Sequence, residues 1–165
     1  IGGWNSLYTW TNPPPQFLEK EIAPFSRWLV WHALISPRLE ILEAAATPLG
    51  GDAWRVRLAV QNTGWLPSNV TRLAKQKKLV RGVVCEIELP PGATLETGRT
   101  REELGQLEGR AGKPAAANTW AGSSADETDD RLKVEWVVRA PAGAVAHLTA
   151  RHERAGAARA AVVLK

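Results

Sequence analysis

The stretch Trp54-Arg-Val-Arg-Leu-Ala-Val-Gln61 alternates strictly between two kinds of position. Its first, third, fifth and seventh residues are large and apolar, whereas the residues between them are charged, polar or small. Because successive side chains of a strand point to opposite faces of a sheet, this period of two predicts one buried and one solvent-facing side. The stretch therefore predicts a half-buried antiparallel strand.

The same period returns in several other segments. The further predicted strands are a start at Leu39–Glu43, then Val80–Leu89, Leu132–Arg139, 144–154 and 158–164. Turns are predicted at Pro48–Asp52 and Pro90–Ala93, and a short Gly-containing connection at Arg154–Ala157. Short strands at hairpin spacing, without strand–helix alternation, predict a mainly β fold: an antiparallel immunoglobulin- or fibronectin-like β-sandwich.

The segments between these strands carry weaker signals. Residues 69–79 have room for one short helical or edge segment, and 98–130 are predicted to be mainly loop with one short strand near Leu104–Leu107. Cys85 alternates with apolar neighbours, which predicts a small buried residue on a strand face. As the only cysteine of the chain, it cannot form an internal disulfide.

The first 37 residues follow a different pattern. Leu18, Ile22, Phe25, Leu29 and His32 recur at helical steps, which predicts a helix over about 15–35. A proline at position 24 would either kink this helix or mark its first turn. The sequence thus predicts two parts: an N-terminal helical arm, residues 1–37, and a β-sandwich domain, residues 38–165.

The arm is rich in aromatic side chains that favour burial. Four of the eight Trp of the 165-residue chain fall in its first 31 residues. We expect the arm to dock on its own sandwich or on a second copy of the chain, because monomers rarely expose so much apolar surface. The candidate interface residues are Trp4, Trp10, Phe25, Trp28 and Trp31.

No set of metal ligands is expected to converge. His147 and His152 are five positions apart, so on a strand they point to opposite faces. His32 lies on the apolar stripe of the arm helix, which favours a core or interface histidine. The acidic run Asp126–Asp130 lacks the spacing of a calcium loop and is predicted to be a solvated loop. We therefore predict no metal site and no cofactor in this chain.

Catalytic constellations are equally hard to assemble. The pair Glu86 and Glu88 faces the exposed side of a strand, and Glu102-Glu103 has no feature that would raise a carboxyl pKa. Ser123-Ser124 lacks the frame of a nucleophile elbow. The sequence thus predicts no catalytic residues, and we expect that this chain is not itself an enzyme.

Charge and hydropathy exclude further classes of partner. The net charge is +4, but the basic residues interleave with acidic ones, and the single basic cluster, Arg72–Lys78, is typical of a solvated face. No apolar run reaches the length of a membrane span. We therefore expect neither nucleic-acid binding nor a membrane span. Asn69-Val-Thr71 matches a glycosylation acceptor, although such triplets arise often by chance.

The arm resembles the final segment of the catalytic domain of zinc metallocarboxypeptidases. The resemblance lies in Ile1-Gly-Gly3, in the proline-containing stretch after it, and in Phe17–Ile35. In that family a general-base glutamate precedes such a segment, and a His-x-x-Glu motif and a distant histidine bind zinc. The resemblance implies that these residues lie upstream of Ile1 in a parent protein and that the chain is a fragment of it. Zinc is implied only for that parent.

The remainder is similar to the β-sandwich that follows the catalytic domain in a bacterial subgroup of these hydrolases. The residues concerned are Trp54–Pro67 and Ala150–Gly156. The same residues are similar to fibronectin-like and adhesion-like sandwiches. The resemblance predicts a non-catalytic C-terminal accessory domain that packs on the missing catalytic domain or limits access to it. A secreted or periplasmic parent is compatible with this, and the compartment stays open.

Two alternatives remain at this point. The first is a carbohydrate- or protein-binding module with Trp65 and Trp120 as loop aromatics, although core Trp are commoner than stacking platforms. The second is an independent small enzyme, which the absence of a converging nucleophile and base disfavours.

Overall fold

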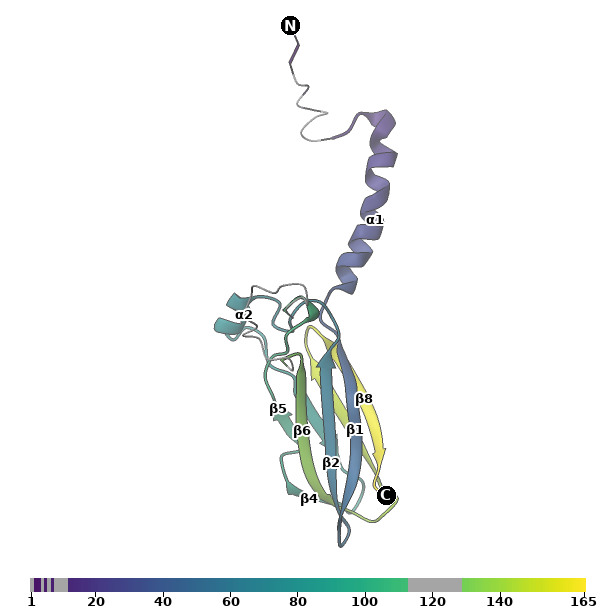
Figure 1. Cartoon of the computed structure of the whole chain (residues 1–165), viewed down its shortest axis with the longest axis vertical. Helices are drawn as coiled ribbons and strands as arrows, with labels where there is room; N and C mark the ends of the chain where they lie inside the picture. The colour runs from purple at the N-terminus through teal and green to yellow at the C-terminus, as the bar shows by residue number, and fades with distance from the viewer. Residues whose placement is uncertain (1, 4, 6, 8–11, 113–128) are drawn as a thin grey trace, which may run out of the picture. The chain divides into compact units, whose positions relative to one another are not determined.

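The computed structural model describes residues 2, 3, 5, 7, 12–112 and 129–165. It contains two compact units, Ile1–Ile35 and Ser36–Lys165. The first holds the predicted N-terminal helix, and the second holds two antiparallel β-sheets (Figure 1).

The first unit consists mainly of helix α1, Leu18–Leu34, preceded by the 3-10 turn η2, Pro15–Phe17. Two glutamates in the first turn of α1 complement the positive end of the helix dipole. Pro24 lies inside α1, so the interpretation of this proline as part of the first turn is wrong. Because it lacks an N–H, Pro24 withholds one backbone donor from the helix. Ser36 and Pro37 follow the C-cap residue of the helix, Ile35.

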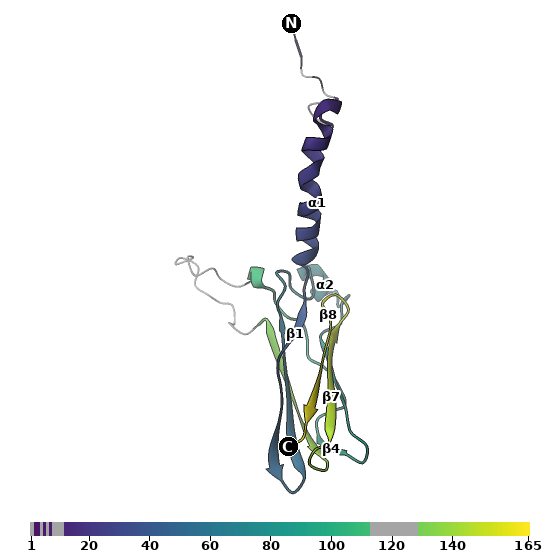
Figure 2. The same ribbon diagram turned by 90° about the vertical axis from the view of Figure 1, so that its right-hand side faces the viewer.

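The second unit is a sandwich of two four-stranded sheets, which confirms the predicted fold class. Figure 2 shows the sheets as separate layers. Sheet A has the order β1-β2-β6-β4, and sheet B has the order β5-β3-β7-β8. The strands are β1 Leu39–Gly50, β2 Ala53–Asn62, β3 Val84–Glu88, β4 Thr94–Thr97, β5 Arg101–Glu103, β6 Arg131–Arg139, β7 Val145–His152 and β8 Gly156–Val163.

The core lies between the sheets and follows the predicted alternation. On β2 the buried residues include Trp54, Val56, Leu58 and Val60, and in register on β6 they meet Val134, Trp136 and Val138. Sheet B contributes Cys85, Ile87, Leu148 and Val162, so the prediction that Cys85 is buried is confirmed. The indole N–H of Trp54 donates to the carbonyl of Ala140 at 2.9 Å, and that of Trp136 to Arg99 at 2.7 Å. Each fully buried side chain of this size stabilises the fold by roughly 1.5–3 kcal/mol.

The first hairpin differs from the prediction. A turn was expected over Pro48–Asp52, but β1 continues to Gly50, and Pro48 pairs with Trp54. A proline is compatible with a strand here because β1 is an edge of sheet A, where one side of the strand has no neighbour to receive an N–H bond. The chain reverses at Gly51 and Asp52, and both have positive φ.

The middle of the chain differs as well. A short strand was expected near Leu104–Leu107, whereas the structure has strands at β4 and β5 and an irregular segment after them. Gly105, with φ of 111°, interrupts the extended chain, and a Cβ on Gly82 would lie 2.7 Å from its backbone. Residues 69–79 contain the short helix α2, Arg72–Gln76, with Thr71 as its N-cap. Another short 3-10 turn, η3, spans Arg110–Gly112.

Candidate functional site

The predicted interface residues of the arm lie on α1 where the structure describes them. Phe25, Trp28 and Trp31 are 58%, 51% and 54% exposed, and no residue of α1 is buried. The ring of His32 lies 4.0 Å from that of Trp28 and 5.6 Å from that of Trp31, measured between centroids. Trp4 and Trp10 lie outside the described residues. Within its own unit, no other described element covers this surface.

The residues considered for metal binding do not come together. Among the described residues, no three His, Cys, Asp or Glu side chains are placed to hold an ion. His147 is exposed and His152 buried on opposite faces of β7. The described residues do not include Ser123, Ser124 or Asp126. Asp130 contradicts the prediction of a solvated loop at its end: it is 1% exposed, and Gln61 donates to its Oδ2 at 2.6 Å.

The paired carboxylates have structural partners. Glu102 Oε1 accepts from the backbone of Arg99 at 3.0 Å, and Glu103 Oε1 accepts from Gly82 at 2.8 Å. Glu86 binds arginines, as described below. Burial, together with the charges of Glu102 and Glu86, raises the pKa of the Cys85 thiol to about 12, so the sulfur stays protonated at neutral pH.

His152 anchors a buried polar chain at the end of sheet B. The backbone N–H of Arg154 donates to its Nδ1 at 3.1 Å, so its Nε2 carries the proton and donates to Oε1 of Gln106 at 3.2 Å. The Ser68 hydroxyl donates to the same oxygen at 2.6 Å. Burial lowers the pKa of His152, which therefore is neutral at pH 7.

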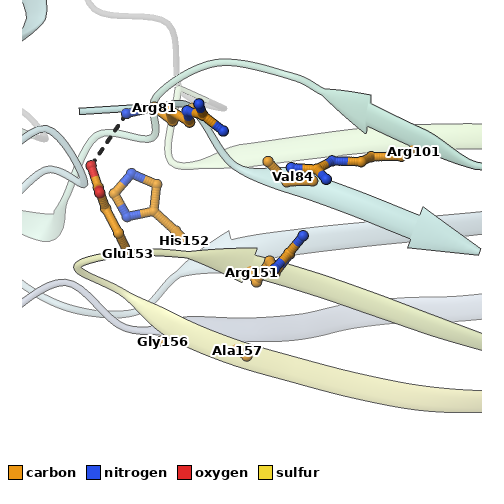
Figure 3. Close-up of a pocket in the computed structure, with 9 residues that line it drawn as sticks. Arg81, Val84, Arg101, Arg151, His152, Glu153, Gly156 and Ala157 are labelled. Carbon is orange, nitrogen blue, oxygen red and sulfur yellow. Dashed lines mark hydrogen bonds between the residues drawn. The ribbon is translucent and has the colours of Figure 1, made fainter. Parts of the chain in front are cut away.

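This polar chain also positions the segment before β3. The Gln106 amide donates to the carbonyls of Val80 and Arg81 at 3.0 and 2.9 Å. The backbone N–H of Arg81 in turn donates to Oε1 of Glu153 at 3.3 Å, which is the dashed line in Figure 3. Arg81 is thereby fixed beside the turn that joins β7 and β8.

An arginine pocket lies on the outer face of sheet B at this point. It has a volume of about 370 Å³, and Figure 3 shows its three arginines entering from different segments. Arg81 precedes β3, Arg101 lies on β5 and Arg151 on β7. The residues that line the pocket are Arg81, Gly82, Val84, Arg101, Arg151, His152, Glu153, Gly156 and Ala157.

One carboxylate orders two of these guanidinium groups. Oε1 of Glu86 lies 2.8 Å from Nη2 of Arg151 and 3.6 Å from Nε of Arg101. The strand register explains why these three side chains lie together. Glu86 pairs with Arg101 of β5, and Val84, two residues before Glu86 on β3, pairs with Arg151 of β7. Within the described part of the chain, the Arg81 guanidinium has no ion-pair partner. The pocket thus combines ordered cations with one uncommitted cation.

A family model described as "Domain of unknown function (DUF8731)" matches residues 38–163. The chain belongs to this family. The DUF8731 match begins two residues after the start of the second compact unit and ends at the last residue of β8. A comparison with curated proteins gives no match.

Within the DUF8731 domain, the arginine pocket was not predicted. Its arginines stand alone in three separate segments, whereas the one basic cluster visible in the sequence, Arg72–Lys78, lies on and after α2. Single arginines within or next to strand segments were the signal of this pocket in the sequence. Strand order is needed to show that these residues come together.

Of the two loop aromatics considered for sugar stacking, one lies within the described residues. Trp65 is 50% exposed, whereas Trp54 and Trp136 belong to the core, and Trp120 lies outside the described residues. Asn69, in the triplet that matches a glycosylation acceptor, is 4% exposed and its amide donates to the carbonyl of Thr71, so its side chain is not accessible.

Proposed function

We propose that the chain is a non-catalytic accessory module of a zinc carboxypeptidase-like protein. In this proposal α1 completes the catalytic domain, and the DUF8731 sandwich packs on that domain or limits access to it. The observation that carries the proposal is the state of α1, which is apolar around most of its circumference. Eight of its large apolar side chains are each more than two-fifths exposed: Leu18, Ile22, Phe25, Trp28, Leu29, Val30, Trp31 and Leu34.

Such a helix is unfavourable in water by itself. Burying one of these side chains fully is worth roughly 1.5–3 kcal/mol, and Pro24 in the interior lowers the stability of the helix further. The sandwich, by contrast, has a continuous core of its own. A helix with this composition is typical of one enclosed by a larger domain, which agrees with the resemblance of Phe17–Ile35 to the last helix of a peptidase.

The proposal places zinc and the catalytic groups upstream of Ile1 in the same polypeptide. It is tested first by the coding sequence that precedes Ile1. We expect a glutamate immediately before Ile1, and further upstream a His-x-x-Glu motif and a distant histidine. A preceding sequence without these residues would contradict the proposal.

The second test is enzymatic. The complete polypeptide is expected to release C-terminal amino acids from peptides in a zinc-dependent manner, and residues 1–165 alone are expected to release none. Zinc-dependent release by the purified chain 1–165 would overturn the assignment as an accessory module. A binding role of the sandwich itself is favoured by one separate observation, the arginine pocket.

A further inference from the structure

We propose that Arg81, Arg101 and Arg151 form a binding site for the carboxylate of an acidic peptide. The site lies on the outer face of sheet B, at the end that carries the β7–β8 turn. The inference goes beyond the accessory role proposed above and does not depend on the identity of the catalytic domain.

Two of the three arginines are held in place by the fold before a ligand binds. A guanidinium group carries five N–H donors in a planar fork that matches a carboxylate. The contacts of Glu86 with Arg151 and Arg101 hold two such forks in place and leave further donors for a ligand. Gln106 and Glu153 fix the backbone of Arg81, so the third side chain starts from a defined position beside the pocket.

The net charge of the site is positive and small. Its three guanidinium groups face the carboxylates of Glu86 and Glu153, which leaves one net positive charge. His152 adds none, because its pKa is lowered by burial. Glu103 accepts from the backbone of Gly82, and Arg154 follows the pocket residue Glu153, so these two carry opposite charges on segments beside the site. One residual positive charge matches a single carboxylate better than a phosphate dianion.

The pocket also offers an apolar surface beside the arginines. The floor consists of Val84, Gly82, Gly156 and Ala157, all small or of moderate size. Two of these are small for reasons of backbone: Gly156 has φ of 81°, and a Cβ on Gly82 would meet Gly105. The fold therefore keeps an apolar floor open next to the cations, which suits the methylene groups of a glutamate side chain.

The test uses the chain 1–165 and saturation-transfer difference NMR, which tolerates self-association of the protein. The probe is the blocked peptide acetyl-Gly-Glu-Gly-amide, with acetyl-Gly-Gln-Gly-amide as the uncharged isostere. We expect saturable binding of the Glu peptide and none of the Gln peptide. Acetyl-Gly-Gly-Gly with a free carboxyl end distinguishes a chain terminus from an acidic side chain as the source of the carboxylate.

Two variants with matched controls locate the site. Arg81→Gln removes the uncommitted cation and should weaken binding about tenfold, the usual scale for one charge-assisted hydrogen bond. Arg55→Gln makes the same charge change on the exposed side of β2 and should leave binding unchanged. Ala157→Leu fills the pocket without altering charge and should abolish binding, whereas Ala161→Leu, on the same face of β8, should have little effect.

Three results would overturn the proposal. They are equal binding of the Glu and Gln peptides, equal weakening by Arg81→Gln and Arg55→Gln, and saturable binding of inorganic phosphate, measured by phosphorus-31 line broadening, when none of the carboxylate probes binds. Thermal unfolding of every variant verifies that it is folded. None of these measurements involves peptidase activity, so the site and the accessory role can fail independently.

Discussion

Asn62, at the end of β2, makes four side-chain hydrogen bonds. Its Oδ1 accepts from the backbone N–H groups of Arg38 and Gly64 at 2.9 and 3.0 Å. Its Nδ2 donates to the carbonyls of Leu66 and Glu108 at 2.8 and 3.0 Å. This fully buried amide thus replaces regular secondary structure where three loops meet.

We predict that Asn62→Ala destabilises the sandwich strongly. The substitution leaves two N–H groups and two carbonyls without their partner, and each buried unsatisfied group costs about 1–3 kcal/mol. Relaxation and entry of water reduce this, so we expect a loss of about 3 kcal/mol in the free energy of unfolding, measured with a chemical denaturant. Thr63→Ala, at the next position, should cost no more than about 0.5 kcal/mol. Equal effects of the two substitutions would refute this role of Asn62.

His152 predicts a dependence of stability on pH. Its pKa is lowered in the folded state, chiefly by burial, so the unfolded chain binds more protons as the pH falls through the ordinary range near 6.5. Of its neighbours, Glu153 favours the charged ring and Arg154 opposes it. The free energy of unfolding should therefore fall between pH 7.5 and pH 5 as the unfolded chain takes up this proton.

The pH effect is checked by comparing denaturant titrations at the two pH values. In His152→Gln the part of the loss that comes from this residue should disappear, because the amide does not titrate. His147→Gln, on the exposed face of the same strand, should keep the full loss. A His152→Gln variant with an unchanged pH dependence would show that the imidazole does not carry the effect.

At the scale of elements, α1 is the helix whose exposed apolar side chains would be stabilised by burial against a partner. In the absence of a catalytic domain, we expect this surface to be covered in solution by the sandwich or by a second copy of the chain. Trypsin should then cleave slowly after Lys20 and Arg27, which both lie on α1. Sedimentation velocity distinguishes the two modes, because only the second gives a dimer.

The matched variants change the aromatic surface or a polar position beside it. Trp28→Ala combined with Trp31→Ala should accelerate trypsin cleavage of the arm at least several-fold, since roughly 3 kcal/mol or more of burial is lost. Ser26→Ala, on the same helix, should leave the rate unchanged. A wild-type monomer whose arm is cleaved rapidly would contradict the expectation.

The same scale shows what periodicity can and cannot predict. The alternation in 54–61 and 132–139 predicted β2 and β6, because one face of each strand is buried against the other sheet. It did not predict that β1 passes through Pro48, because the tolerance for proline comes from the edge position of the strand. It placed a strand at Leu104–Leu107, where Leu107 is buried as a strand residue would be, but Gly105 adopts φ of 111° and breaks the extended run.

At the scale of the whole molecule, the two-part organisation follows from a change of period near Arg38. The arginine pocket follows from no such local pattern. Arg81, Arg101 and Arg151 become neighbours only through the order β5-β3-β7, and sequence alternation does not encode strand order. The same holds for the buried polar chain that positions the segment of Arg81. Its members, Ser68, Gln106 and His152, come from three distant segments.

The point where the chain enters the sandwich has a mechanical consequence. The backbone N–H of Arg38 is held by Asn62 of sheet A, and that of Leu39 by the carbonyl of Ala155 in the turn before β8 of sheet B. Moving the start of β1 away from sheet A would therefore also break a hydrogen bond to sheet B, so the two sheets are coupled at this point.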